Sequence, residues 1–308
     1  MKKKFLSLYA IAAIACFAFS ACGGEKNAPT PPSTPNVGNP DDPKEPEKKA
    51  STLQVYLCIG QSNMYGSADI EEIDKEVPDR LLMMASTDHP KTGREMGKCY
   101  PAIPPLSNPN AGLCPADNFG RTMVQNLPDS VKVLLINVSV AGCDIRIFDK
   151  DLYEDYNGKN AEKWFKDLVA AYDGSPYHRL LRLAKFAMVQ EKGTIEGIIL
   201  HQGETNTGDK QWPNYVKKIY NDLLTDLQLK AEDVPILAGE MVHENMGGKC
   251  SAMNPIIRTL PETIPTAYVI SSDGCTEKGD KVHFDSDGVR QLGRAYAVKM
   301  LEVKKFKK

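Results

Sequence analysis

The sequence predicts an α/β domain in which a parallel β-sheet is covered by helices on both faces. Five short apolar runs that favour β-structure recur along the chain, at residues 53–59, 131–138, 195–200, 235–239 and 266–270. Stretches with apolar residues at helical spacing lie between or after these runs, and such alternation is typical of parallel sheets. Polar clusters follow four of the runs. Because open α/β sheets bind ligands at the carboxyl ends of their strands, we expect the functional residues at that edge.

The first 51 residues are expected to lie outside this domain. Residues 1–21 combine a basic start with an apolar stretch, which is the pattern of a secretory signal peptide. Cys22 ends a Phe-Ser-Ala-Cys sequence that resembles the processing box of bacterial lipoproteins, which predicts a lipid anchor at Cys22. Residues 22–51 are rich in proline and charge and lack aromatic residues, which predicts a disordered linker. The domain then spans residues 52–308.

A lipid anchor would hold the protein in the cell envelope, at the periplasmic face or on the surface of the outer membrane. Plain secretion is the alternative, because Phe19 stands where lipoproteins usually have leucine. In either case, we expect no contact with the membrane other than a lipid anchor at Cys22.

The composition is that of an ordinary globular domain and disfavours several classes of function. The chain has 308 residues, of which 42% are hydrophobic and 25% charged. Cleavage before Cys22 removes three of 38 basic residues and none of the 40 acidic ones, which gives a formal charge of −5. No basic face indicates a nucleic-acid partner, and no cysteine or histidine spacing indicates a metal site. We expect no cofactor, and the oligomeric state is not predicted.

The first strand, at residues 53–59, leads into Gly60-Gln-Ser-Asn-Met64 and a second glycine at Gly66. A short apolar run that ends in glycine-flanked polar residues predicts a buried strand followed by a tight turn. That turn would hold Ser62 at the carboxyl end of the strand. Ser62 would then be either a helix cap or a nucleophile, and a nucleophile needs a base.

Two long inserts and three helices account for the rest of the chain. Residues 67–118 are punctuated by prolines and residues 144–175 carry six aromatic residues, so both are predicted to be irregular binding loops, although the aromatic residues would equally cover a sheet edge. The helices are predicted from apolar stripes at residues 177–190, 212–229 and 289–300.

The cluster before the last helix contains Asp280 and His283, three residues apart. This spacing lets the carboxylate bind Nδ1 of the imidazole and leaves Nε2 free to take a proton from Ser62, which are the roles in a Ser-His-Asp triad. The alternative is that Asp280 or Asp285 is a surface or capping acid and His283 is packed.

Acyl transfer also needs hydrogen-bond donors for the developing oxyanion. The candidates are the backbone N–H groups of Ser62 and Gly142 and the side-chain amide of Gln202 or Asn63. Gln202 would equally serve as a buried amide that ties loops together. Glu204 is expected to brace His283 or to orient Gln202.

An envelope location permits disulfides among the six cysteines of the domain. Loop-like sequence around four of them favours two bridges, Cys99 with Cys114 and Cys250 with Cys275. The other two, which lie at apolar strand ends, are expected to be buried thiols: Cys58 and Cys143.

Four motifs together resemble the SGNH hydrolases, and more closely the sialate O-acetylesterase-like domain that includes carbohydrate esterase family 6, the acetylxylan esterases. They are Gly60-Gln-Ser-Asn-Met64, Val140-Ala-Gly-Cys-Asp-Ile145, His201-Gln-Gly-Glu204 and Asp280-Lys-Val-His283-Phe. The resemblance spans residues 53–301, with gaps in the two inserts. It implies a flavodoxin-like, three-layer α/β/α sandwich with a five-stranded parallel sheet.

The resemblance also implies a serine esterase that removes O-acetyl groups from carbohydrates through an acyl-serine, with acetylxylan or O-acetylated sialic acid as substrate. By motif position, Ser62 is the nucleophile, His283 the general base and Asp280 the acid that orients it, with Glu204 as the rival acid. Ser62, Gly142 and Gln202 match the oxyanion hole. The chain departs from its relatives where Gly142 lies between alanine and cysteine in place of Gly-Gly-Thr.

Two other functions are compatible with parts of the sequence. An SGNH lipase or thioesterase would need a long apolar slot, whereas the inserts are rich in proline, asparagine, aspartate and tyrosine. A non-catalytic carbohydrate-binding surface lipoprotein would not need Ser62, Asp280 and His283 together. An α/β-hydrolase is disfavoured because no Gly-x-Ser-x-Gly elbow surrounds Ser62.

Overall fold

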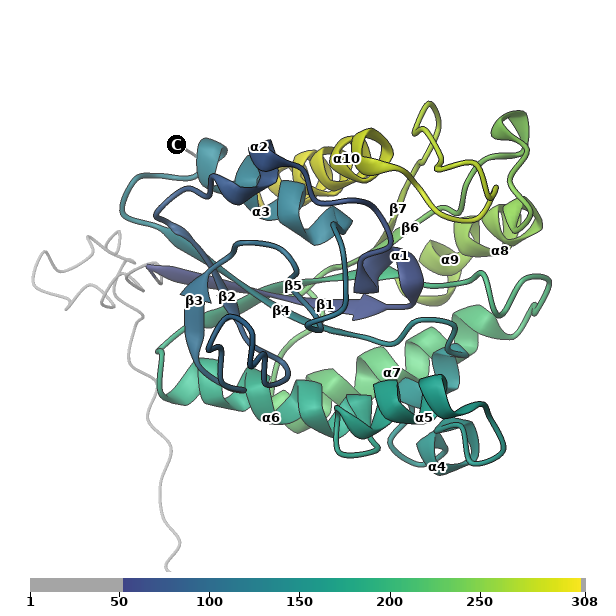
Figure 1. The fold of residues 1–308 in the computed structure, drawn as a ribbon, viewed down its shortest axis with the longest axis horizontal. Helices are drawn as coiled ribbons and strands as arrows, with labels where there is room; N and C mark the ends of the chain where they lie inside the picture. Colours follow the sequence, from purple (N-terminus) through teal and green to yellow (C-terminus); the bar gives the residue numbers. More distant parts are fainter. Residues whose placement is uncertain (1–51, 306–308) are drawn as a thin grey trace, which may run out of the picture. The chain divides into compact units, whose positions relative to one another are not determined.

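A mixed, mostly parallel β-sheet with helices on both faces forms the domain (Figure 1). The structure is a computed structural model and describes residues 52–305. The expected signal peptide, lipidated Cys22 and linker lie outside this range and stay predictions. Within it, no helix combines the length and the apolar character that a membrane crossing requires.

The strands are β1 Leu53–Gly60, β2 Leu81–Met84, β3 Cys99–Pro101, β4 Lys132–Ser139, β5 Thr194–His201, β6 Ile236–Gly239 and β7 Ala267–Ile270. The α-helices are α1 Ser62–Tyr65, α2 Glu72–Lys75, α3 Pro115–Asn126, α4 Tyr153–Tyr156, α5 Lys163–Ala170, α6 Pro176–Val189, α7 Trp212–Leu227, α8 Asn254–Arg258, α9 Leu260–Thr263 and α10 Ser286–Lys304. Short 3₁₀ turns occupy Ile145–Phe148, Glu244–Met246 and Ser251–Met253.

The strand order is β3-β2-β4-β1-β5-β6-β7, and only the β2–β3 pair is antiparallel. The chain builds one side of β1 with β2 and β4 and then crosses to the other side with β5. This reversal makes β1 the centre of the sheet and opens a crevice at its carboxyl end, where α/β sheets bind ligands.

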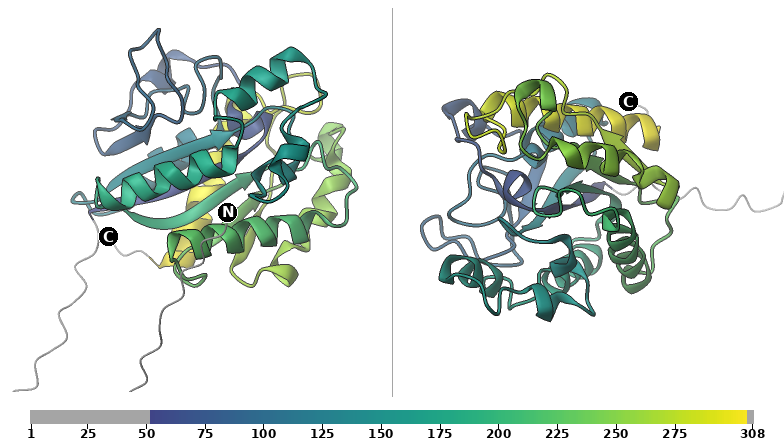
Figure 2. Two further views of the ribbon diagram at one scale, coloured as in Figure 1. Left: turned by 90° about the horizontal axis from the view of Figure 1, so that it is seen from below. Right: turned by 90° about the vertical axis from the view of Figure 1, so that its right-hand side faces the viewer.

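Both faces of the sheet are apolar, as a doubly covered parallel sheet requires. On β1, Val55, Leu57 and Ile59 belong to one core and Tyr56 and Cys58 to the other. Residues of α5, α6, α7, α8 and α9 contribute to the first core, and α1, α3 and α10 contribute to the second. Figure 2 shows α6 and α7 on one face and α10, in yellow, behind the strands in the left-hand view.

The α/β sandwich is confirmed, but the sheet has seven strands, two more than expected. The five expected strands are β1, β4, β5, β6 and β7. The additional pair, β2 and β3, forms within residues 67–118, which were predicted to be irregular. Its strands have four and three residues, and β3 ends in a proline that only an edge strand tolerates. Such short segments lack a periodic signal.

The two expected disulfides are wrong: all six cysteines among the described residues are free thiols. Cys99 packs against the first core and Cys114 lies in the second, so the sheet separates them. Cys250 and Cys275 are likewise on opposite faces. The other two cysteines, Cys58 and Cys143, are fully buried, as expected.

Candidate active site

Ser62 follows β1 through a turn that only glycine permits. A Cβ on Gly60 would lie 2.1 Å from the backbone oxygen of His201 on β5, so the two backbones approach too closely for a side chain. Ser62 then begins α1. The N–H of Gly66 and the hydroxyl of Ser67 both donate to the carbonyl of Ser62, at 2.9 and 2.8 Å. The backbone of Ser62 is therefore fixed, while the residue stays partly exposed.

His283 lies against Ser62, although 221 residues separate the two in sequence. Ser62 Oγ is 2.8 Å from His283 Nε2, and His283 Nδ1 is 2.7 Å from Asp280 Oδ2. The other oxygen of Asp280 accepts the N–H groups of Val282 and His283, at 2.9 and 2.8 Å. The neighbouring Asp285 is the cap of α10, because its side chain accepts from Gly288 N. The two acids therefore occupy different positions: Asp285 caps the helix and Asp280 holds the imidazole.

The charge of Asp280 determines which nitrogen of His283 carries the proton. Burial raises the pKa of Asp280, but hydrogen bonds from the backbone and imidazole of His283 and from the backbone of Val282 outweigh burial and lower the pKa to about 2. Asp280 is therefore a carboxylate at neutral pH and accepts from Nδ1–H. In neutral His283, Nε2 is then the acceptor for the hydroxyl of Ser62.

Asn63 connects the serine turn to the histidine loop. Its side chain is fully buried, and Nδ2 donates to Glu204 Oε1 at 2.7 Å and to the carbonyl of Val282 at 3.2 Å. Its Oδ1 accepts the N–H of Phe284 at 3.2 Å. Sequence reasoning considered Asn63 only as an oxyanion donor and missed this bridging position. Since both amide hydrogens of Asn63 bind protein oxygens, the residue fixes the distance between Ser62 and His283.

Glu204 lies beneath this site and makes no hydrogen bond to His283. Its side chain is 4% exposed, and Oε1 lies 4.0 Å from His201 Nε2. Oε2 has no hydrogen-bond partner among the described residues. Burial raises the pKa of Glu204 to about 7, and burial lowers the pKa of His201 to about 3. Of the two candidate acids, only Asp280 is in contact with the imidazole.

Gly142 follows β4 at the same edge of the sheet. Its φ of +71° lies in the left-handed region, which favours glycine. The N–H groups of Ser62 and Gly142 donate to no acceptor within residues 52–305. They are therefore available to a ligand.

Gln202 is buried, and its amide is engaged inside the protein. Nε2 lies 3.0 Å from Gln61 Oε1, 3.1 Å from the carbonyl of Cys143 and 2.7 Å from Asn206 Oδ1. Its Oε1 accepts from Trp212 Nε1 at 2.5 Å. The side-chain amide of Gln202 carries two hydrogens, and three protein acceptors lie within reach of them, so neither hydrogen is left for an oxyanion. This arrangement matches the second role considered for Gln202, that of a buried amide joining the loops after β1, β4 and β5.

One group of carboxylates in the described part of the chain lies close enough to share a cation, and it consists of Asp149, Asp151 and Asp222. Lys218 Nζ donates to all three, at 2.9, 2.7 and 2.8 Å. An internal ammonium thus already occupies the position between these carboxylates, and Lys150 Nζ also lies 3.4 Å from Asp222 Oδ1.

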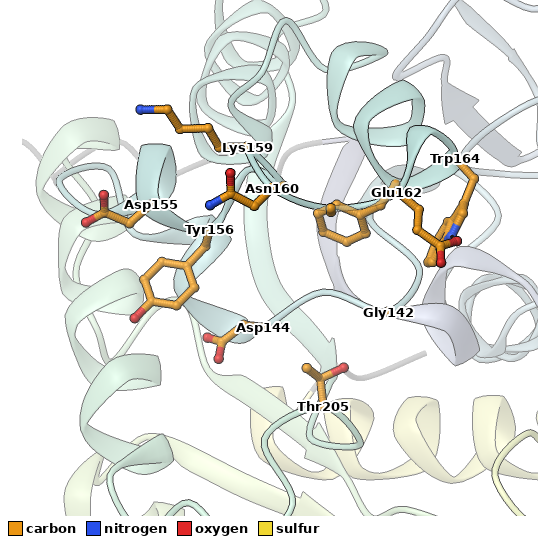
Figure 3. A pocket seen from close by; sticks show the side chains of 12 residues that line it. Gly142, Asp144, Asp155, Tyr156, Lys159, Asn160, Glu162, Trp164 and Thr205 are labelled. Carbon is orange, nitrogen blue, oxygen red and sulfur yellow. Dashed lines mark hydrogen bonds between the residues drawn. The ribbon is translucent and has the colours of Figure 1, made fainter.

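A pocket of about 700 Å³ opens beside Gly142 (Figure 3). Most of its wall comes from the second insert, through residues 155–165, and Gly142, Asp144 and Thr205 complete it. The N–H of Thr205 donates to Gln61 Oε1 at 3.2 Å, so the pocket wall is joined to the residue that precedes Ser62. The volume is within the range of about 300–1,000 Å³ that is usual for small-molecule sites.

Comparisons with known proteins cover almost all of the described domain. A family model described as "Carbohydrate esterase, sialic acid-specific acetylesterase" matches residues 52–302. A solved structure from Arabidopsis thaliana is similar with a TM-score of 0.60 and 16% identity, covering 81% of this chain and 98% of that one. NanS gives a TM-score of 0.59 and 16% identity, with 81% and 97% covered. A carbohydrate acetylesterase from Xanthomonas citri gives 0.57 and 16%, with 82% and 56% covered. At these identities the three structures share the fold with this chain.

Proposed function

The chain belongs to the sialic acid-specific acetylesterase family of carbohydrate esterases, and from this premise we propose that it cleaves O-acetyl esters through an acyl-enzyme on Ser62. Membership of the family makes the protein a carboxylic ester hydrolase that acts on acetylated carbohydrates. Acetylated xylan and O-acetylated sialic acid are the two substrates that we consider.

The observation that carries this proposal is the chain of contacts from Asp280 through His283 to Ser62, at 2.7 and 2.8 Å. His283 Nε2 takes the proton from the Ser62 hydroxyl as Oγ attacks the acetyl carbonyl. Asp280 holds the Nδ1–H tautomer and stabilises the imidazolium. His283 then returns the proton to the sugar oxygen as the C–O bond breaks, which leaves acetyl-Ser62. Water activated by His283 releases acetate.

The oxyanion of each tetrahedral intermediate needs donors that are already in place. We assign this role to the backbone N–H groups of Ser62 and Gly142, since neither donates to an acceptor within the described domain. Gln202 is assigned a positioning role, because its amide holds Gln61 and Asn206.

A serine substitution tests the proposal. Ser62→Ala should lower kcat/KM for p-nitrophenyl acetate by at least about 10⁴-fold, as loss of a serine nucleophile does in triad enzymes. Ser271→Ala is the matched control, because Ser271 is an exposed serine that follows the edge strand β7. Folded Ser62→Ala with the wild-type rate would refute the assignment of the nucleophile.

A further inference from the structure

Trp164 is a large exposed aromatic side chain held in one orientation. It lies on α5 and is 52% exposed, whereas the other tryptophan, Trp212, is fully buried. Its indole Nε1 donates to Glu162 Oε2 at 2.8 Å, and its ring meets the edge of Phe165 with a centroid distance of 5.7 Å. A side chain that merely covered the sheet edge would be buried. Trp164 instead presents a fixed apolar surface to solvent.

The indole reaches the proposed oxyanion site. A Cβ built on Gly142 would lie 3.2 Å from Cη2 of Trp164, which places the ring against that glycine. Figure 3 shows Trp164 and Glu162 side by side above Gly142, with Tyr156 and Asp144 further along the pocket. A sugar ring lying on the indole would therefore lie close to Gly142. The C–H face of a pyranose is apolar and flat enough to cover an indole.

The charges around this pocket disfavour an anionic ligand. Its ionisable lining consists of three carboxylates and one ammonium: Asp144, Asp155, Glu162 and Lys159. The ammonium of Lys159 points away from Trp164 in Figure 3. No arginine lines the pocket within the described residues. Asp144 is paired with Arg146, which leaves the carboxylates of Asp155 and Glu162 against the ammonium of Lys159. A carboxylated sugar would therefore add a further negative charge to a wall that is already net negative.

The nearest guanidinium, Arg146, is already engaged. It binds Asp144 in a bidentate pair, with Nε and Nη2 at 2.8 and 2.7 Å from the two carboxylate oxygens. Its plane lies between the rings of Tyr156 and Tyr215, at 4.4 and 4.7 Å from their centroids. Arg146 therefore supports the pocket wall and is not a free partner for a ligand carboxylate.

We propose that this pocket is the sugar subsite, that Trp164 is its stacking platform, and that it selects neutral acetylated sugars over acidic ones. The inference rests on the proposed function and deepens it, because it favours acetylated xylan-type substrates over O-acetylated sialic acid. Glu162 is a positioning residue that holds the indole.

A kinetic comparison tests the platform. For acetylated xylo-oligosaccharides, Trp164→Ala should lower kcat/KM at least tenfold more than it does for p-nitrophenyl acetate, which has no sugar. Phe186→Ala is the control, because Phe186 is 43% exposed on α6 and lies outside the pocket. It should change neither value. Equal losses of the two activities in Trp164→Ala would overturn the platform.

A binding experiment separates this inference from the proposed function, since it needs no turnover. In Ser62→Ala, an acetylated xylo-oligosaccharide should change the tryptophan fluorescence, because Trp164 is the exposed one of two tryptophans. The double variant Ser62→Ala/Trp164→Phe should show no such change in fluorescence. An unchanged spectrum at saturating ligand would overturn the subsite, whatever Ser62→Ala does to hydrolysis.

The selectivity has its own test. Wild-type kcat/KM should be at least tenfold higher for the methyl ester of 9-O-acetyl sialic acid than for the free acid, because the ester lacks the carboxylate. A rate for the free acid that equals or exceeds that of its methyl ester would overturn the preference for neutral sugars.

Discussion

Two loops at the carboxyl edge of the sheet each contain a histidine and an acidic residue three positions apart, but the pairs differ in distance, in burial and in the direction of the acid's pKa shift. His201 is the last residue of β5 and Glu204 follows it, whereas Asp280 and His283 precede α10. In the first loop the imidazole and carboxylate are 4.0 Å apart, and in the second they are 2.7 Å apart. Burial raises the pKa of Glu204 to about 7, whereas hydrogen bonds that outweigh burial lower the pKa of Asp280 to about 2.

The two histidines differ because the first loop is buried and the second is partly exposed to solvent. The side chain of His201 is 0% exposed, and Nε2 has no partner among the described residues. His283 is 27% exposed and is held on both sides, by Asp280 and by Ser62. A histidine that must gain and lose a proton needs a paired carboxylate and access to substrate, and only the second loop supplies both. The first loop supplies support, because Glu204 holds Asn63.

The largest expected effect separates the two acids by kinetics. Asp280→Asn should lower kcat/KM for p-nitrophenyl acetate by about 10³–10⁴-fold, since the amide no longer holds the Nδ1–H tautomer. Glu204→Gln should cost less than about tenfold, because an amide oxygen still accepts from Asn63. The two variants change one atom each and are each other's control. If Glu204→Gln lost most of its activity while Asp280→Asn kept most of it, Glu204 and not Asp280 would be the acid that orients His283.

A smaller expected effect is a pH dependence of the free energy of unfolding that comes from Glu204. The pKa of Glu204 is raised from 4.5 to about 7, so the folded protein holds this proton more tightly than the unfolded chain does. The contribution of protonated Glu204 to the free energy of unfolding is fully present below pH 4.5 and is lost as the pH rises through about 7. Glu204→Gln cannot ionise, so the wild type should lose on the order of 3 kcal/mol relative to this variant across that window.

Denaturant unfolding of both proteins at pH 4.5, 6 and 8 measures this difference. His201, whose pKa is lowered to about 3, gives stability that rises with pH, but it is present in both proteins and cancels. A constant difference between wild type and variant at all three pH values would show that Glu204 is not a buried titrating group.

Much of this architecture could be predicted from the sequence because its signals are local. The five parallel strands are apolar runs, and Asp280 and His283 lie in one turn, so spacing alone predicts their contact. Gly60 could be recognised as the start of a tight turn, because an apolar run that ends in glycine indicates one. The SGNH-type motifs supplied the order of the loops around β1.

What the sequence could not predict depends on contacts between distant segments. Asn63 donates hydrogen bonds to Glu204 and Val282. The amide nitrogen of Gln202 donates to Gln61, Cys143 and Asn206. Neither arrangement has a local signature. The disulfide expectation was wrong for the same reason, because loop-like sequence does not show on which face of the sheet a cysteine lies. Trp164 was visible only as one of six aromatic residues in its insert.

Trapping of the nucleophile tests the central claim most directly. The enzyme should react with an alkyl fluorophosphonate, and peptide mass spectrometry should find one adduct, on the peptide that contains Ser62. His283→Ala should label at least about 10³-fold more slowly, because it lacks the base. An adduct on another residue, or unchanged labelling of Ser62 in His283→Ala, would contradict the account.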